Sequence, residues 1–150
     1  MNASNDVGLY TVQPIGRIHT IYRTLDDCPK NSRFCTETCS VEIFPAFAEA
    51  LGHIESASHL IVMYWLDRAD RSILSRPATL DGIVRGAFAT RSPMRPNPIG
   101  LSIVPLFERK GHVLSTGGFD CLDGTPLVDI KPYLCSNDCF PSAVVAWNKS

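Results

Sequence analysis

With 150 residues, the chain is long enough for one domain that buries roughly two-thirds of its unfolded surface, so no disulfide or metal is needed to make it fold. Its 14 Lys and Arg residues balance 15 Asp and Glu residues, which excludes a global basic field and leaves only a local patch for nucleic acid or membranes. No apolar run approaches the ~20 residues that span a bilayer, and residues 1–7 lack a signal-peptide pattern, so we expect a cytoplasmic protein.

The chain begins with a strand pattern followed by a long polar segment. Residues 10–22 alternate apolar and polar side chains and are rich in β-formers, which predicts a strand with an edge or bulge at Pro14 and Gly16. His19 lies on the polar phase and is more simply explained as an exposed strand histidine than as a functional one. Residues 24–40 lack periodicity, which predicts a loop, and a loop of 17 residues is usually functional or disordered.

The next elements are a strand, a short helix and a second strand. Residues 41–51 begin with a strand pattern and continue as a short helix after Pro45, a residue favoured at the first helical position, until Gly52. Residues 57–66 form a near-continuous apolar run, which predicts a central buried strand. The alternating charges of residues 67–71 fit a solvated rim.

The second half of the chain predicts short strands joined by turns. The predicted strands are residues 83–89, 101–109, 113–119 and part of 120–134, with 143–147 as a last strand or a docking tail. Pro105 places its strand near an edge or bulge, and residues 110–112 predict a hairpin turn. Six or seven short strands, one short helix and no βαβ rhythm indicate an all-β, compact antiparallel barrel or sandwich, in a single domain over residues 1–150.

Residues 86–101 (GAFATRSPMRPNPIGL) contain three prolines within six residues. Because proline fixes φ and removes a donor, this segment cannot be the interior of a helix or of a central strand, and it predicts a rigid loop. The loop presents Thr90, Arg91, Ser92, Arg95 and Asn97. Loops carry function when a scaffold holds them. A preorganised ligand loop and a proline-stiffened connection with solvated arginines both fit these residues.

Residues 123–133 form a second rigid polar segment, which carries Asp123, Asp129, Lys131 and Tyr133. If these side chains face the loop at residues 90–100, the two segments predict a preorganised ligand pocket. The simpler alternative is that Asp129 pairs with an arginine. The sequence contains no serine-hydrolase, zinc-protease, phosphate-loop or dinucleotide-binding motif.

Six cysteines are unusual for a chain without an export signal, and reduced thiols or a metal site fit better than disulfides. Their spacing matches no strong zinc signature. If the two ends of the chain meet, thiols from both ends would converge on a metal or redox site. The candidates are Cys28, Cys35, Cys39, Cys135 and Cys139. Scattered structural thiols without a metal are the alternative.

Residues 86–101 and 123–133 (DGTPLVDIKPY) closely resemble the two signatures of the TrmO (TsaA-like) methyltransferase family. Residues 15–19 (IGRIH) and 58–66 (SHLIVMYWL) are similar to its supporting motifs. The resemblance implies a six-stranded β-barrel that binds S-adenosyl-L-methionine and forms a homodimer. It also implies the activity of the characterised bacterial members, N6-methylation of threonylcarbamoyladenosine beside the tRNA anticodon.

The resemblance places cofactor contacts in four segments of this chain. They are Pro29, Lys30 and Asn31; Asp67 and Arg68; Arg91 and Leu101; and Asp123, Gly124, Thr125 and Pro126. A guanidinium suits the carboxylate of the cofactor, oxygen acceptors suit its ammonium and ribose, and apolar walls suit its adenine. Asp129 and Tyr133 are the candidates for accepting the proton from adenine N6.

Three features differ from the common pattern of the family. Pro29-Lys30-Asn31 stands where Pro-Arg-Gln is usual, and Asp67 stands where a histidine is common. The chain also stops about where the barrel ends, as expected of a short form without the C-terminal domain of the bacterial tRNA enzymes. Three alternatives therefore stand beside tRNA: a small-molecule acceptor, a protein acceptor, and a cofactor-binding, cysteine-rich metal or redox module without tRNA activity.

Overall fold

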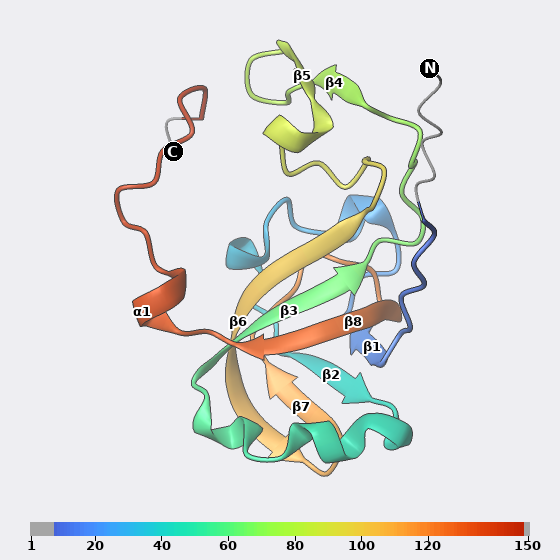
Figure 1. Ribbon diagram of the computed structural model, residues 1–150, viewed down its shortest axis with the longest axis vertical. Helices are drawn as coiled ribbons and strands as arrows, with labels where there is room; N and C mark the ends of the chain where they lie inside the picture. Colours follow the sequence, from blue (N-terminus) through green and yellow to red (C-terminus); the bar gives the residue numbers. More distant parts are fainter. Residues whose placement is uncertain (1–7, 149–150) are drawn as a thin grey trace.

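The computed structural model describes residues 8–148, and its centre is a closed antiparallel barrel of six strands (Figure 1). Neighbouring strands follow the order β1-β2-β7-β6-β3-β8. Their bounds are β1 Gly16–His19, β2 Cys39–Ile43, β3 His59–Trp65, β6 Ile99–Lys110, β7 Val113–Thr116 and β8 Thr125–Pro132. The predicted all-β class and six-stranded antiparallel barrel are therefore confirmed. The polar leader, residues 1–7, lies outside the described residues.

Alternate residues of each strand point into the barrel and form its core. The fully buried side chains include Ile18, Val41, Leu60, Val62, Val104, Leu114, Phe119 and Leu127. Tyr64 lies among them, with its ring edge-on to Phe119 at a centroid distance of 6.0 Å and its hydroxyl 2.7 Å from Asp120. Gly100 makes room for this ring, because a Cβ there would lie 2.1 Å from Cε2 of Tyr64.

The connections leave the barrel at its two ends. One end, which we call the loop end, carries residues 20–38, 66–98 and 117–124, because β1, β3 and β7 finish there and β2, β6 and β8 begin there. The opposite end carries the 3₁₀ helices η3 (Pro45–Leu51) and η4 (Ile54–Ser56) and the turn at Gly111, whose φ is +62°. The chain after β8 also starts from the opposite end.

A small arm, residues 72–89, projects from the loop end and stands away from the barrel (Figure 1). It consists of the two-stranded sheet of β4 (Ser75–Pro77) and β5 (Val84–Gly86), followed by η5 (Ala87–Ala89). The tail after α1 (Cys135–Asp138) reaches this arm, where the Arg85 guanidinium lies 4.3 Å from the Trp147 ring. Trp147 is thus the tail residue that contacts the arm, while residues 143–146 are exposed and Val145 forms one isolated bridge with Asn148.

Several predicted elements differ from the observed ones. The predicted strand over residues 10–22 is reduced to Gly16–His19, and it ends there because the Thr20 and Tyr22 N–H groups bond to side-chain oxygens instead of a neighbouring strand. The helix after Pro45 forms as the 3₁₀ helix η3 and ends at Gly52, and β4 forms at residues where no strand is predicted. The predicted strand at residues 113–119 ends at Thr116.

Two further predictions concern β3 and β6. The strand predicted at residues 57–66 is confirmed as β3, but it is buried on one face, with Ile61, Met63 and Trp65 partly exposed on the other. Pro105 lies beside an irregularity in β6, as predicted, since the register with β7 shifts between Leu106 and Glu108. Among residues 8–148, no helix has the length and apolar character to cross a membrane.

Candidate functional site at the loop end of the barrel

The loop end brings together the four segments that the sequence nominates for cofactor binding. Strand register fixes this arrangement, because Trp65 pairs with Ile99, Tyr64 with Leu127, and Ile18 with Thr125. The exit of β3 at residues 67–68, the entry of β6 and the turn before β8 are therefore neighbours. Residues 29–31 lie in the first loop of the same end.

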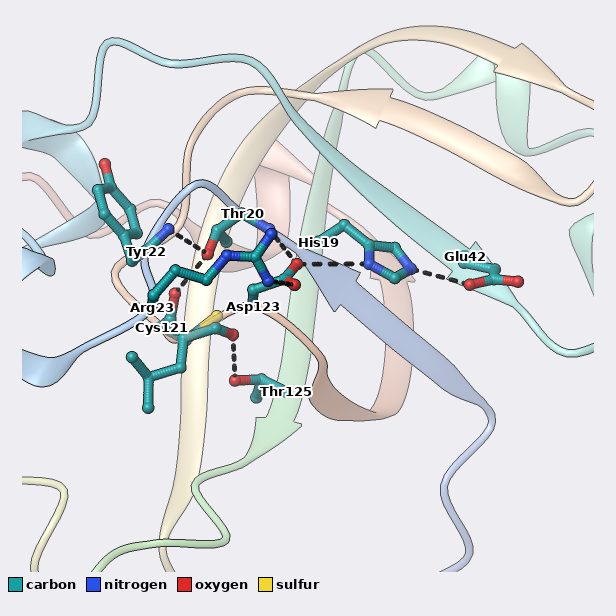
Figure 2. A network of polar contacts seen from close by, with 9 residues as sticks. His19, Thr20, Tyr22, Arg23, Glu42, Cys121, Asp123 and Thr125 are labelled. Carbon is teal, nitrogen blue, oxygen red and sulfur yellow. Dashed lines mark hydrogen bonds and ion pairs between the residues drawn. The ribbon is translucent and has the colours of Figure 1, made fainter.

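The turn before β8 is fixed by backbone hydrogen bonds to the exit of β1. Gly124 N donates to Ile18 O at 2.9 Å, and Asp123 N donates to Tyr22 O at 2.9 Å. Gly124 has a φ of +79°, which favours glycine at this position. The Thr125 hydroxyl donates to Leu122 O at 2.6 Å and closes the turn (Figure 2). Residues 123–126 are thus presented on a rigid support.

The Asp123 carboxylate is the centre of a polar network (Figure 2). It accepts a hydrogen bond from Thr20 N at 3.1 Å, forms an ion pair with Arg23, and lies 3.4 Å from Nδ1 of His19. The other ring nitrogen of His19 lies 2.8 Å from Glu42. Partial burial raises the pKa of Asp123, but Thr20 N–H, Arg23 and His19 outweigh it and hold that pKa below its usual value. Asp123 is therefore an anion, and its contacts connect the end of β1 to the start of β8.

Arg91 and Leu101 are in direct contact. The Nη2 of Arg91 donates to the Leu101 carbonyl oxygen at 3.3 Å, and both side chains are exposed. Arg95 has a different role, because its guanidinium is half-buried and donates to the carbonyl oxygens of Thr90, Ser92 and Ala87. Arg95 therefore holds the proline-rich loop in shape, while Arg91 keeps donors at the surface.

Neighbouring segments also support the proline-rich loop. Arg71 donates to Pro96 O at 2.8 Å and stacks over the Trp65 ring at 5.3 Å. From the arm, Arg76 donates to the Ser92 hydroxyl at 3.2 Å. Asp67 and Arg68 lie exposed on the segment that leads to Arg71. The loop is therefore preorganised from three sides, as the sequence predicts.

The first loop contains two short 3₁₀ helices, η1 (Leu25–Asp27) and η2 (Ser32–Phe34), with Pro29 and Lys30 between them. Asn31 is the N-cap of η2, and its side chain accepts a hydrogen bond from Arg33 N at 3.0 Å. Lys30 is exposed. The loop is therefore structured, and it presents one cation and one amide at the loop end.

Comparison with known proteins identifies the family. The model of the tRNA-methyltransferase O (TrmO) N-terminal domain matches residues 17–139.

The chain belongs to the TrmO family.

Relatives and solved structures agree with this assignment. A probable S-adenosyl-L-methionine-binding protein of Archaeoglobus fulgidus is 48% identical over 139 residues, which cover 93% of this chain and 38% of the relative. The tRNA (adenine(37)-N6)-methyltransferase of Escherichia coli is 40% identical over 69% of this chain and 47% of the enzyme. The crystal structure of TrmO from Pseudomonas aeruginosa superposes with a TM-score of 0.79 at 31% identity, over 97% of this chain and 65% of that one. The chain thus spans less than two-thirds of each of these proteins.

The second rigid segment named from the sequence, residues 123–133, is mostly the strand β8 and not a loop. Its two prolines lie near the strand ends, where fewer ladder hydrogen bonds are lost. Asp129 is in an ion pair with Lys131 at 2.7 Å and not with an arginine. Tyr133 lies eight residues beyond Thr125, about 26 Å along an extended strand. The structure therefore separates Tyr133 from Asp123 and places it at the opposite end.

Asp129 and Tyr133 are also separated from each other. Four residues of extended chain correspond to about 13 Å. Asp129 pairs with Met63, which pairs with Leu101 on its other side, so Asp129 lies about 10 Å from Leu101 across two strand spacings. Of these two side chains, Asp129 is the one that faces the same side of the sheet as Leu101.

The cysteines predicted to converge lie in two groups. Cys28, Cys35 and Cys39 are at the loop end, whereas Cys135 begins α1 and Cys139 is its C-cap, beyond the far end of β8. The extended β8 keeps the two groups apart. All six cysteines are free thiols, and within residues 8–148 no three His, Cys, Asp or Glu side chains are arranged to hold a metal ion.

Sequence reasoning missed His19, Thr20 and Arg23, which hold the Asp123 carboxylate. Cys121, left out of the converging set, is also at the loop end, where burial raises the pKa of its thiol. The available signal for His19 was its place in the family motif at residues 15–19. No local pattern pointed to Thr20 or Arg23, because their contact with Asp123 joins residues about one hundred positions apart.

Proposed function

We propose that this protein binds S-adenosyl-L-methionine and transfers its methyl group to N6 of threonylcarbamoyladenosine beside the tRNA anticodon. Membership of the TrmO family supports the proposal. The printed names of two relatives also support it, one as a probable S-adenosyl-L-methionine-binding protein and the other as a tRNA (adenine(37)-N6)-methyltransferase. Since tRNA is found in the cytoplasm, the proposal includes a cytoplasmic location.

The observation that carries the proposal is the exposed guanidinium of Arg91, held against the Leu101 carbonyl oxygen at the loop end. A guanidinium presents paired donors that match a carboxylate such as that of the methionine part of the cofactor. Arg95 makes the backbone contacts that shape the loop, so Arg91 is available for a ligand.

The other donor and acceptor groups suit the remaining parts of the cofactor. Asp67 offers a carboxylate to an ammonium or ribose, Asn31 and Lys30 offer polar groups from the first loop, and Leu101 offers apolar surface to adenine. The turn of residues 123–126, clasped through Asp123, forms a fixed wall. The bound cofactor supplies an electrophilic methyl group on its sulfonium. The chain's own contribution is to hold donor and acceptor at attack distance, which accelerates bimolecular reactions.

We propose Asp129 as the group that accepts the proton from adenine N6. Its carboxylate is partly exposed on the outer face of β8, in the row that leads through Met63 to Leu101. Tyr133 was named with it from the sequence, but its position about 13 Å farther along the chain restricts the proposal to Asp129.

Isothermal titration with S-adenosylhomocysteine, the demethylated cofactor, tests binding. We expect the wild-type protein to bind and Arg91→Ala to weaken binding by about 1.5–3 kcal/mol, the usual range for a hydrogen bond to a charged group. Lys110→Ala is the matched control, because it removes an exposed cation at the opposite end of the barrel. A folded wild-type protein that does not bind the ligand would contradict the cofactor assignment, and unchanged affinity in Arg91→Ala would remove Arg91 from the site.

Methyl transfer to purified tRNA tests the acceptor. Labelled methyl from S-adenosyl-L-methionine should enter tRNA that carries threonylcarbamoyladenosine, and tRNA from cells unable to make that nucleoside should remain unlabelled. Asp129→Asn should lower the rate without weakening cofactor binding. If the protein binds cofactor but labels neither tRNA, the acceptor is a small molecule or a protein instead.

We also propose that the protein is a homodimer. The outer face of β3 and β6 supports this, because the cross-strand pairs Ile61–Ile103, Met63–Leu101 and Trp65–Ile99 make it apolar. We call these six residues the β3–β6 apolar face. Leu101 is 42% exposed and Ile103 is 46% exposed. Contiguous apolar surface of this kind marks sites of association, and a second copy of the chain is the occupant that we propose.

A further inference from the structure

Two thiols at the loop end converge on one backbone oxygen. Cys35 is the C-cap of η2, and Cys39 begins β2 four residues later. The Sγ atoms of Cys35 and Cys39 lie 3.8 and 4.0 Å from the carbonyl oxygen of Glu37. Cys35 is also near enough to help raise the pKa of the Cys39 thiol, after the larger effect of burial. The two sulfur atoms are therefore adjacent, although both are reduced.

Gly118 and Tyr22 fix the position of the Cys35 sulfur. A Cβ on Gly118 would lie 2.0 Å from Cys35 Sγ and 3.1 Å from Glu37 O, so only a residue without a side chain lets the thiol pack there. The Tyr22 hydroxyl oxygen lies 3.1 Å from the same sulfur. This hydrogen bond, together with burial, raises the pKa of Tyr22, so the phenol keeps its proton. The contact with Tyr22 and the close approach to Gly118 therefore hold the Cys35 sulfur in place.

The two cysteines differ in access to solvent. Cys35 is partly exposed, whereas Cys39 is 4% exposed and burial raises the pKa of its thiol. An exposed, hydrogen-bonded thiol beside a second, shielded thiol is the arrangement in which the first reacts with an oxidant and the second resolves the product.

We propose that Cys35 and Cys39 are a redox pair that a peroxide oxidises to a reversible disulfide. The Cys35 thiolate attacks one peroxide oxygen and becomes a sulfenic acid, and the other oxygen leaves as water after it takes up a proton. The Cys39 sulfur then attacks the Cys35 sulfur and displaces the hydroxyl as a second water. In total, two thiols lose two hydrogens, one peroxide becomes two waters, and a cellular thiol reductant restores the pair.

Formation of the disulfide changes the first loop. The two sulfur atoms must approach to about 2.05 Å, which takes Cys35 away from Tyr22, Gly118 and Glu37 O. Cys35 is the C-cap of η2 and Asn31 is its N-cap, so a shift at one end of this three-residue helix moves the other. Asn31 and Lys30 are proposed cofactor contacts. This regulatory step rests on the proposed function, and it lowers cofactor affinity in the oxidised form.

Mass spectrometry of the full chain tests the disulfide directly. After treatment with hydrogen peroxide, alkylation and digestion, we expect one linkage, Cys35 to Cys39, that dithiothreitol reverses. Cys35→Ser should abolish it, with Cys39→Ala as a second variant, whereas the double variant Cys135→Ser, Cys139→Ser should retain it. Alkylation of both Cys35 and Cys39 after peroxide would overturn the proposal, as would linkage of Cys35 to Cys28 or Cys121.

Titration with S-adenosylhomocysteine tests the regulatory step. We expect the oxidised protein to bind at least about tenfold more weakly than the reduced protein, since loss of one or two hydrogen bonds has an effect of this size. Peroxide should leave the affinity of Cys35→Ser unchanged. Equal affinity of the mapped disulfide form and the reduced form would overturn the regulation. A reduced protein that does not bind S-adenosylhomocysteine would reject the proposed function. The redox pair would then be tested by the mass-spectrometric disulfide map alone.

Discussion

Asp123 shows how contacts of unequal strength share one carboxylate. Thr20 N–H is on a residue that is only 8% exposed, whereas the side chains of His19 and Glu42 are 40% and 38% exposed. Exposed ion pairs contribute little to stability, because water and salt screen them. A buried donor without an acceptor is costly, because it loses its hydrogen bond to water on folding. The hydrogen bond from Thr20 is therefore the contact that matters most for folding.

We expect Asp123→Ala to destabilise the protein by about 1–3 kcal/mol, the penalty for an unsatisfied buried donor. His19→Ala should have a smaller effect, because Thr20 N–H and Arg23 still hold Asp123 in that variant. Asp123→Asn, which keeps one acceptor oxygen, should fall between them. Urea unfolding measures all three free energies, and an equal loss in His19→Ala and Asp123→Ala would show that the contacts of Asp123 depend on the histidine.

At the residue scale, the sequence is informative where a residue belongs to a long local motif. Arg91, Leu101 and Asp123 were named in advance because residues 86–101 and 123–133 are distinctive, and the structure places them at one end of the barrel. Their chemical partners were not predictable, because the register between β1 and β8 decides them. Asp129 and Tyr133 are both proton-acceptor candidates in the sequence, and the extended strand β8 separates them.

The arm is stabilised by an ion pair between Asp81 and Arg85. Asp81 lies in the turn between β4 and β5, and both of its carboxylate oxygens accept hydrogen bonds from Arg85, at 2.7 and 2.8 Å. The hydrogen bond to Arg85, with smaller contributions from Ile83 N–H, lowers the pKa of Asp81 to about 2 from 3.8. Arg85 also stacks on Trp147, so one side chain links the arm to the tail.

The depressed pKa of Asp81 gives a pH prediction with a definite sign. The carboxylate stabilises the arm at pH values above the unfolded pKa of 3.8, and this contribution is lost as the pH falls towards 2. NMR of the carboxyl carbon should show the Asp81 midpoint near 2, and Arg85→Gln should raise that midpoint towards the ordinary value. A midpoint near 3.8 in the wild-type protein would contradict the ion pair.

A second element-scale prediction concerns the packing of β6 against β3. A Cβ at Gly100 would overlap the Tyr64 ring, which is held in the core by Phe119, Asp120 and Ser102. Gly100→Ala should therefore destabilise the protein by about 1–3 kcal/mol, as overpacking of a core does. Gly86→Ala is the control, because its nearest contact would be 3.9 Å away. Thermal unfolding measures both, and an equal melting temperature for the two variants would contradict this account.

At the element scale, hydrophobic patterns located the strands and backbone partners decided their lengths. The strand at residues 57–66 is visible in the sequence because both of its faces are apolar. One face lines the core of the barrel, and the other belongs to the β3–β6 apolar face. The strand predicted over residues 10–22 extends too far beyond His19, because the hydrophobic pattern does not reveal that Thr20 N–H bonds to a side chain. The β4 and β5 strands have three residues each, which is too short for a period to be visible.

The whole molecule presents the β3–β6 apolar face on the outside of its barrel. Leu101 on this face is a proposed cofactor contact, so the number of subunits is tested at Ile103, which is not one. We expect Ile103→Glu to convert the protein from dimer to monomer, because a buried carboxylate without a partner is strongly unfavourable. Light scattering after size exclusion measures the mass. Val144→Glu, at an exposed position of the tail, is the control and should leave the mass unchanged. A dimeric Ile103→Glu variant would place the interface elsewhere.

The single-domain organisation over residues 1–150 stays a prediction at this scale. The strand order around the barrel could not be derived from the sequence, because β7 lies between β2 and β6 and β8 lies between β1 and β3. Such pairings join distant segments, and no local pattern records them. The periodicity of the sequence does not distinguish a closed barrel from a sandwich. The family resemblance predicts the barrel.

The seam between β1 and β8 links the order of folding to the candidate site. Pairing across this seam joins residues such as Thr20 and Asp123, which are 103 positions apart, so its loop-closure entropy makes it slow to form. Local hairpins such as β6–β7 need no such closure. The wall at residues 123–126 is therefore complete only when the seam between β1 and β8 is closed. A ligand that binds this wall would recognise fully closed barrels alone and would slow their opening, so the rate of unfolding would report occupancy of the site.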